Sequence, residues 1–245
     1  MENFAGFFEQ RGFRCHTPAY RYHDDLRSEQ SAKLRTGLSI ADYVEDVAEC
    51  VKSFSSPPIL VGHSLEGLIA QKLGARGLAK ALVLLTPASP SGINALTYSV
   101  VKSFWSVLTR WGFWRKSNQL SYNASSYAML HRVPEAERKA LYEKFVYESG
   151  RAAFEIGFWL MDFKRAAQVQ ASQVTCPVLV IAGAEDRITP AAVVEKVARR
   201  YSLSTFRKFD NHAHWVVGEP GWEEIANFSA EWLKAIEPEA ISSKL

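Results

Sequence analysis

Residues 57–73 read PPILVGHSLEGLIAQKL, and this stretch organises the rest of the chain. The two prolines end whatever precedes them, and residues 59–61 form an uninterrupted apolar run, as in a parallel strand buried on both faces. Apolar residues then recur at helical spacing from Leu68 onward. Ser64 therefore stands on a tight turn between a buried strand and a helix, and we expect its hydroxyl to project above the sheet.

Strands and helices alternate on both sides of this stretch. Ser39 is a candidate cap for a helix over 40–54, and Asp42 lies in its first turn. Further apolar runs predict strands over 81–86 and 176–183, a final strand is expected over 205–209, and helices are expected over 191–201 and 222–236. Such alternation predicts an α/β fold: a mostly parallel sheet with helices on both faces.

The first forty residues are less regular. A short helix is expected over 3–11, and a strand is expected over 13–17, before Pro18. From Tyr20 to about Ser39, including Asp24 and Asp25, the sequence is polar and predicts a surface loop. Residues after Pro238 predict a frayed tail.

Residues 89–172 break the alternation. They show no convincing strand, and helical periodicity predicts segments near 93–111, 135–148 and 150–168. This interval holds half of the aromatic residues of the chain and is locally basic. We therefore divide the chain into a core over 1–88 and 173–245 and a helical insertion over 89–172.

Composition limits the classes of protein to which the chain can belong. With 245 residues and a net charge of +3, it is long enough for one large core and has no strongly basic balance that favours nucleic acid. Three scattered cysteines predict buried thiols in a reducing compartment, and no metal-ligand spacing is visible. Without a signal-peptide pattern or an apolar run of about 18 residues, a cytoplasmic protein is expected.

The turn at Ser64 resembles the nucleophile elbow of the α/β-hydrolase family, written G-x-S-x-G. The residues here are Gly-His-Ser-Leu-Glu-Gly over 62–67, so Glu66 stands where the pattern has a small residue and Gly67 comes one place late. This departure predicts strain, a shifted turn or an altered protein. The resemblance extends from near the start of the chain to about residue 236.

Two further strand ends strengthen this resemblance. Asp186 follows one predicted strand and His214 follows the last, so nucleophile, acid and base occur in the family's order. The resemblance implies that His214 takes the proton of Ser64 and that Asp186 orients the imidazole. Glu185 is the alternative acid. His212 is the alternative base, and its non-catalytic interpretation is a histidine in a turn.

Three neighbours of the serine receive roles from the same resemblance. The backbone N–H of Leu65 would donate to the developing oxyanion, and His63 and Glu66 would surround the nucleophile. No cofactor and no metal is implied. Family members also carry an upstream strand and a His-Gly loop that this sequence lacks, so we expect an N-terminally truncated sheet and impaired activity.

The implied function is a serine hydrolase (class EC 3.1) that cleaves a carboxylic ester of modest size, with 89–172 as a lid over the small-molecule ester or acyl site. Thioesterases, C–C hydrolases and perhydrolases share the triad, and a non-catalytic binding protein is the alternative from another class. A membrane surface touched by the lid through Trp105, Trp111, Phe113 and Trp114 is a further partner left open. Assembly into a homo-oligomer is left open too.

Overall fold

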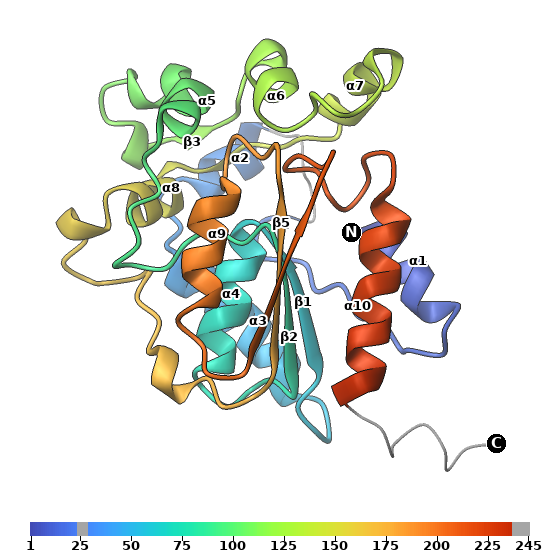
Figure 1. Ribbon diagram of the computed structural model, residues 1–245. Helices are drawn as coiled ribbons and strands as arrows, with labels where there is room; N and C mark the ends of the chain where they lie inside the picture. The colour runs from blue at the N-terminus through green and yellow to red at the C-terminus, as the bar shows by residue number, and fades with distance from the viewer. Residues whose placement is uncertain (24–28, 237–245) are drawn as a thin grey trace.

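A four-stranded parallel sheet forms the centre of the molecule (Figure 1). The computed structural model describes residues 1–23 and 29–236. The strands lie in the order β1 (Ile59–His63), β2 (Ala81–Leu85), β5 (Val178–Gly183) and β6 (Ser204–Phe209). The predicted α/β class is confirmed, and the strands begin and end within two residues of the predicted bounds.

Helices cover both faces of this sheet. The helices of the core are α1 (Glu2–Glu9), α3 (Ile40–Lys52), α4 (Leu65–Gly74), α9 (Ala191–Ala198) and α10 (Trp222–Ile236). Side chains of a strand point alternately to opposite faces. Leu82 and Leu84 of β2 therefore pack with α3, α4 and α9, whereas Val83 and Leu85 pack with α1 and α10. Two apolar cores result, one on each side of the sheet.

The segment between β2 and β5 is mainly helical; α5, α6 and α7 lie beyond the carboxyl ends of the strands, at the top of Figure 1, and the chain then returns to the opposite end of the sheet before β5. Its elements are α5 (Tyr98–Leu108), η1 (Phe113–Arg115), β3 (Ser117–Asn118), α6 (Tyr122–Ala128), α7 (Glu135–Tyr142), β4 (Glu148–Ser149), α8 (Gly150–Gly157), η2 (Trp159–Met161) and η3 (Ala171–Gln173). The expectation that it holds no strand is wrong, because β3 and β4 pair antiparallel. At two residues each, they are too short to leave a sequence pattern.

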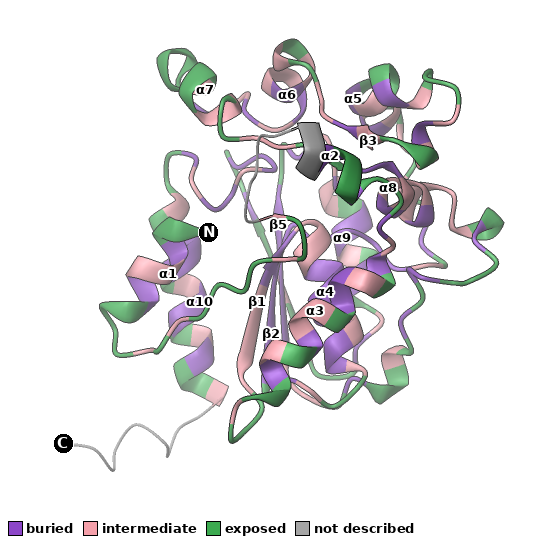
Figure 2. Cartoon of the chain, turned by 180° about the vertical axis from the view of Figure 1, so that it is seen from behind, coloured by how far each residue is buried: buried purple, intermediate pink, exposed green. Residues whose placement is uncertain are grey.

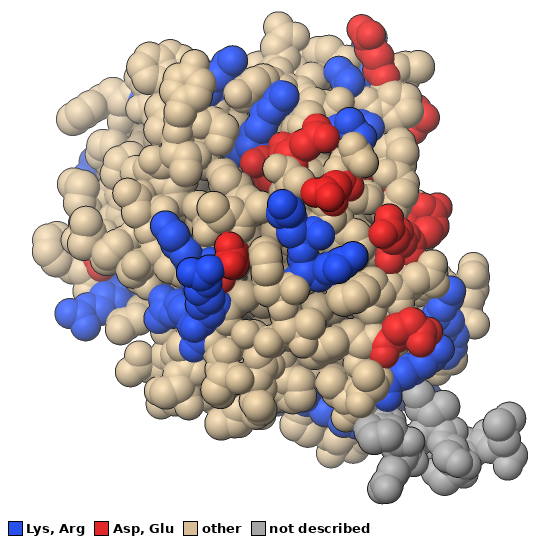
Figure 3. Space-filling model, viewed as in Figure 1, with Lys and Arg blue, Asp and Glu red and all other residues tan. Residues whose placement is uncertain are grey.

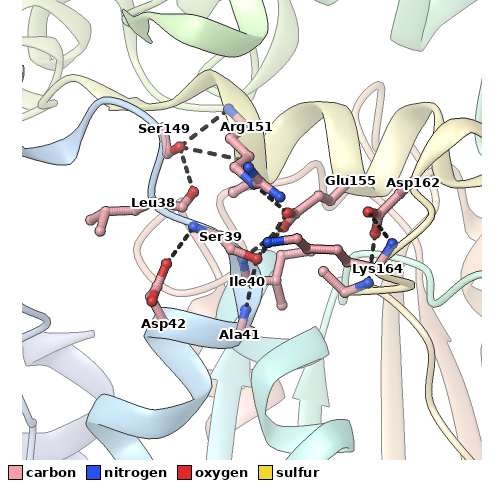
Figure 4. A network of polar contacts seen from close by, with 12 residues as sticks. Leu38, Ser39, Ile40, Ala41, Asp42, Ser149, Arg151, Glu155, Asp162 and Lys164 are labelled. Carbon is pink, nitrogen blue, oxygen red and sulfur yellow. Dashed lines mark hydrogen bonds and ion pairs between the residues drawn. The ribbon is translucent and has the colours of Figure 1, made fainter.

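A buried carboxylate fixes this segment to the core (Figure 4). Glu155 of α8 is only 1% exposed and accepts hydrogen bonds from Ser39 Oγ, from Ile40 N at 2.8 Å and from Arg151 Nε at 2.8 Å. Ser39 also forms the predicted cap, and Asp42 completes a capping box. The negative charge of Glu155 therefore lies at the positive end of α3, where it is stabilised.

Several expectations for the rest of the chain are wrong. Residues 13–17 are extended but join no sheet, so the predicted strand is absent. The predicted loop contains α2 (Glu29–Arg35). Asp24, Asp25 and the tail after Pro238 lie outside the described residues. The three cysteines are free and partly exposed rather than buried.

Basic and acidic side chains are interspersed on the face shown in Figure 3, with uncharged surface between them. This distribution agrees with the small net charge of the sequence. Within the described residues, no helix is long and apolar enough to cross a membrane.

Candidate active site

Ser64 occupies the turn between β1 and α4 in a conformation that side chains rarely adopt, with φ 55° and ψ −116°. Its backbone is held on both sides: its N–H donates to Leu85 O at 3.0 Å, and its carbonyl oxygen accepts from Ala88 N at 2.8 Å. No side-chain hydrogen bond engages its hydroxyl among the described residues. A strained serine at the carboxyl end of a parallel strand is thus available to an incoming group.

Two glycines make this turn possible. A Cβ at Gly62 would collide with the carbonyl oxygen of Glu66, and a Cβ at Gly67 would lie 2.7 Å from Pro87 Cβ. The close approaches therefore occur at positions 62 and 67. Glu66 lies in the first turn of α4, and its carbonyl oxygen is the atom that a Cβ at Gly62 would meet.

Asp186 and His214 meet at the same edge of the sheet. His214 Nδ1 lies 2.8 Å from Asp186 Oδ2, and both side chains are buried. The carboxylate also accepts from the backbone N–H groups of Ile188 and Thr189 at 2.7 and 2.8 Å and from Thr189 Oγ1 at 2.7 Å. These donors hold Asp186 in one orientation. Nothing in the sequence marked Thr189 as part of this arrangement, because a threonine before a proline is common in loops.

The hydrogen bonds define which ring nitrogens carry protons. An ionised carboxylate only accepts, so His214 Nδ1 carries the proton and Nε2 is left as an acceptor. His63 Nε2 donates to the carbonyl oxygen of His214 at 2.7 Å, and the two ring centroids lie 4.8 Å apart. Burial and the neighbouring His214 lower the pKa of His63 to about 3, so this ring is neutral. His63 therefore supports the backbone that carries His214.

The alternative acid Glu185 and the alternative base His212 contact other residues than the Asp186–His214 pair. The Glu185 side chain is 42% exposed and lies 3.5 Å from Arg132 Nη1. His212 is buried, and its Nδ1 lies 3.0 Å from Glu219 Oε1. The same oxygen accepts from Ala213 N at 2.7 Å, so Glu219 closes the loop that precedes α10.

Glu66 and Leu65 lie at the start of α4. Burial raises the pKa of the Glu66 carboxyl to about 7. The N–H of Leu65 is at the first position of the helix and has no intrahelical acceptor, as expected there. A helix N-terminus with a free N–H can stabilise negative charge that develops beside Ser64.

The four aromatic residues considered for a membrane face differ in exposure. Trp105 and Trp111 are 62% and 88% exposed, whereas Phe113 is buried. Trp114 is half-buried and contacts Trp111, Phe113 and Phe154. A membrane contact through these residues stays a prediction.

Comparisons with known proteins agree with this geometry. Residues 27–221 match the family described as serine aminopeptidase, S33. No curated protein matched in the sequence comparison.

Solved structures with the same fold are distant in sequence. A pyrethroid hydrolase from Sphingobium faniae JZ-2 has a TM-score of 0.70 at 15% identity, covering 97% of this chain and 93% of that one. A Paleococcus ferrophilus monoacylglycerol lipase has a TM-score of 0.58 at 22% identity, covering 82% and 77%. A membrane phospholipase A described as a bacterial virulence factor has a TM-score of 0.65 at 17% identity, covering 97% and 76%.

Proposed function

The chain belongs to the serine aminopeptidase S33 family of the α/β-hydrolase superfamily, and from this premise we propose that it hydrolyses a carboxylic ester of modest size through Ser64, His214 and Asp186. The observation that carries the proposal is the strained Ser64 at the end of β1, at the same sheet edge as the bonded Asp186–His214 pair. The lipase and hydrolase names among the fold neighbours favour the same reaction class.

The reaction follows from the protonation states. Ser64 Oγ attacks the ester carbonyl carbon while its proton passes to His214 Nε2. The carbonyl oxygen becomes negatively charged and accepts a hydrogen bond from Leu65 N–H. The intermediate collapses, the C–O bond breaks, and the alcohol leaves with the proton from His214. Water then attacks the acyl-enzyme by the same steps, which releases the acid and restores Ser64.

Residues 89–172 would cover this site as a lid. They follow β2, and their helices α5, α6 and α7 lie beyond the carboxyl ends of the strands, where ligands bind in open α/β sheets. The anchoring of α8 by Glu155 makes the base of this lid rigid. We therefore assign the acyl and alcohol groups of the ester to the space between the lid and Ser64.

The decisive experiment is labelling of the purified protein with a fluorophosphonate probe, beside a Ser64→Ala control. We expect labelling of the natural protein, with mass spectrometry placing the adduct on Ser64, and at least a 1,000-fold loss in the control. A panel of esters with varied acyl length then defines the substrate. A folded natural protein that takes no label would overturn the proposal and favour a binding protein without catalysis.

A further inference from the structure

The residue directly after Asp186 binds the helical segment between β2 and β5. Arg187 Nη1 donates to the carbonyl oxygen of Tyr127 in α6 at 2.8 Å, and its guanidinium carbon lies 4.4 Å from the centre of the Tyr127 ring. The backbone oxygen of Arg187 also accepts from Ser103 Oγ of α5 at 3.4 Å. A charge-assisted hydrogen bond and a cation–π contact thus join α6 to the loop of residues 184–190, here called the acid loop.

A second arginine contacts the loops of both proposed catalytic residues. Arg132, in the turn after α6, has its Nη1 3.5 Å from Glu185 Oε1 of the acid loop, and its Nε donates to Asn211 O at 3.0 Å. Asn211 belongs to the loop between β6 and α10, residues 210–221, here called the base loop. It has a positive φ of 60° and lies three residues before His214. The bond from Arg132 therefore holds a turn of unusual conformation close to the base.

Residues 127–132, here called the docking segment, belong to the inner part of the helical segment. Most of α6 is buried or half-buried, and Ala128 and Leu130 are fully buried, whereas none of the eight described residues of α7 is buried (Figure 2). His131 Nε2 lies 4.0 Å from Glu185 Oε2, but burial lowers the pKa of this histidine, so its ring is neutral. The two arginines therefore carry the charged contacts of the docking segment with the loops.

The orientation of Asp186 depends on the backbone that follows Arg187. The N–H groups of Ile188 and Thr189 donate to Asp186 Oδ1 at 2.7 and 2.8 Å. A change in the path of the chain at Arg187 moves both donors. Contacts that fix Arg187 consequently fix the carboxylate that orients the histidine ring.

We propose that the docking segment positions the Asp186–His214 pair, and that Arg187 and Arg132 are the positioning residues. The proposal rests on the proposed hydrolase function, because it assigns this pair to catalysis. Neither arginine contacts the ester, and each acts through the loop that it holds. The two loops also share a backbone hydrogen bond with an N–O distance of 2.9 Å, so loss of an arginine slows the reaction without abolishing it. The docking segment stays in place while an ester enters, since its displacement would release the acid loop.

The first test is the rate at which a small dialkyl fluorophosphate labels Ser64, measured per folded molecule. A probe of this size needs few contacts with the helical segment, so its rate reports on the serine and its base. We expect labelling to slow about tenfold in Arg187→Ala and about threefold in Arg132→Ala, because the first bond is shorter and less exposed. Unchanged labelling of Arg187→Ala would overturn the proposal.

Two further variants separate positioning from general damage to the helical segment. Arg110 donates to Asn118 Oδ1 at 3.2 Å within this segment, and no bond among the described residues joins it to either loop. We expect Arg110→Ala to label within about twofold of the natural protein. Arg187→Lys keeps the cation but loses the planar guanidinium, and its rate should lie between those of the natural protein and Arg187→Ala. Equal losses in Arg110→Ala and Arg187→Ala would contradict positioning through the docking contacts.

Steady-state kinetics with a short and a long ester separate positioning from substrate binding. Positioning predicts that Arg187→Ala lowers kcat by the same factor for both esters and leaves KM within about twofold. A side chain that instead contacts the acyl group would raise KM, and the rise would grow with the length of the chain. That second result would overturn the proposal.

Amide hydrogen exchange tests the same contacts without catalysis. In Arg187→Ala we expect the amides of Ile188 and Thr189 to exchange about tenfold faster than in the natural protein, with no change at Leu84 in the central strand β2. Equal exchange at residues 188 and 189 in the two proteins would overturn the positioning role. A natural protein that neither labels nor cleaves esters, but shows this difference in exchange, would remove the hydrolase function and keep the positioning of the pair.

Discussion

His212 and His214 both lie in the loop after β6, and each bonds to a buried carboxylate, but the two carboxylates come from different parts of the fold. His212 bonds to Glu219 at 3.0 Å, and His214 bonds to Asp186 at 2.8 Å. Both pairs are buried. By residue type, distance and burial alone, either histidine qualifies as a general base.

The surroundings separate the pairs. Glu219 belongs to the same loop as His212 and also accepts from Ala213 N, so this pair closes the loop upon itself. Gly221 packs against the other ring nitrogen of His212, since a Cβ there would lie 3.3 Å from Nε2. Asp186 instead comes from the end of β5. A pair that joins two strand ends can position a base, whereas a pair within one loop stabilises that loop.

Replacement of the two histidines tests this distinction with the largest expected effect. We expect His214→Gln to lower the turnover of a reactive ester by about 10⁶-fold, because no base remains for Ser64. His212→Gln should stay within about tenfold of the natural protein at a temperature where both are folded. Steady-state kinetics on the same ester measure both, and equal losses would remove the distinction between the pairs.

Replacement of Glu219 is expected to affect stability more than turnover. Glu219→Gln keeps an acceptor for Ala213 N but loses the charge-assisted bond to His212. We expect the free energy of unfolding in urea to fall by about 1–3 kcal/mol, while kcat per folded molecule changes little. A variant with unchanged stability and strongly reduced kcat would mean that this pair serves the reaction.

Glu66 sharpens the comparison, because none of the described histidines bonds to its carboxyl. Its pKa rises from 4.5 to about 7 in the folded state, so folding favours the protonated form. The resulting stability is complete below pH 4.5 and is lost as the pH rises through 7. We therefore expect Glu66→Gln to match the natural protein near pH 4 and to exceed it by about 3 kcal/mol at pH 8. Urea unfolding at both pH values measures this, and an equal difference at the two would contradict the buried-carboxyl explanation.

The central strands could be predicted from the sequence because burial on both faces leaves continuous apolar runs, as at 81–85 and 178–183. The N-terminus of α3 was also predictable, since its cap depends on Ser39 and Asp42 within one turn. Residues 13–17 were not, because a strand requires a partner strand and local propensity does not supply one.

Part of the candidate site could also be predicted from the sequence, and part could not. Ser64, Asp186 and His214 each follow a predicted strand, so their common position at one sheet edge could be inferred before the structure was known. Their catalytic roles remain predictions. The contact between His212 and Glu219 could not be inferred, because it depends on how the loop returns after seven residues.

The adjacency of β2 and β5 has a consequence for synthesis on the ribosome. The two strands pair directly, although residues 86–177 separate them in the chain. At about 5–20 residues per second, β5 emerges on the order of ten seconds after β2. During this interval β1 and β2 have only each other, and a two-stranded unit is marginal in water. The nascent chain therefore exposes two apolar strands for a time in which chaperones can bind, and its yield depends on how well that interval is protected.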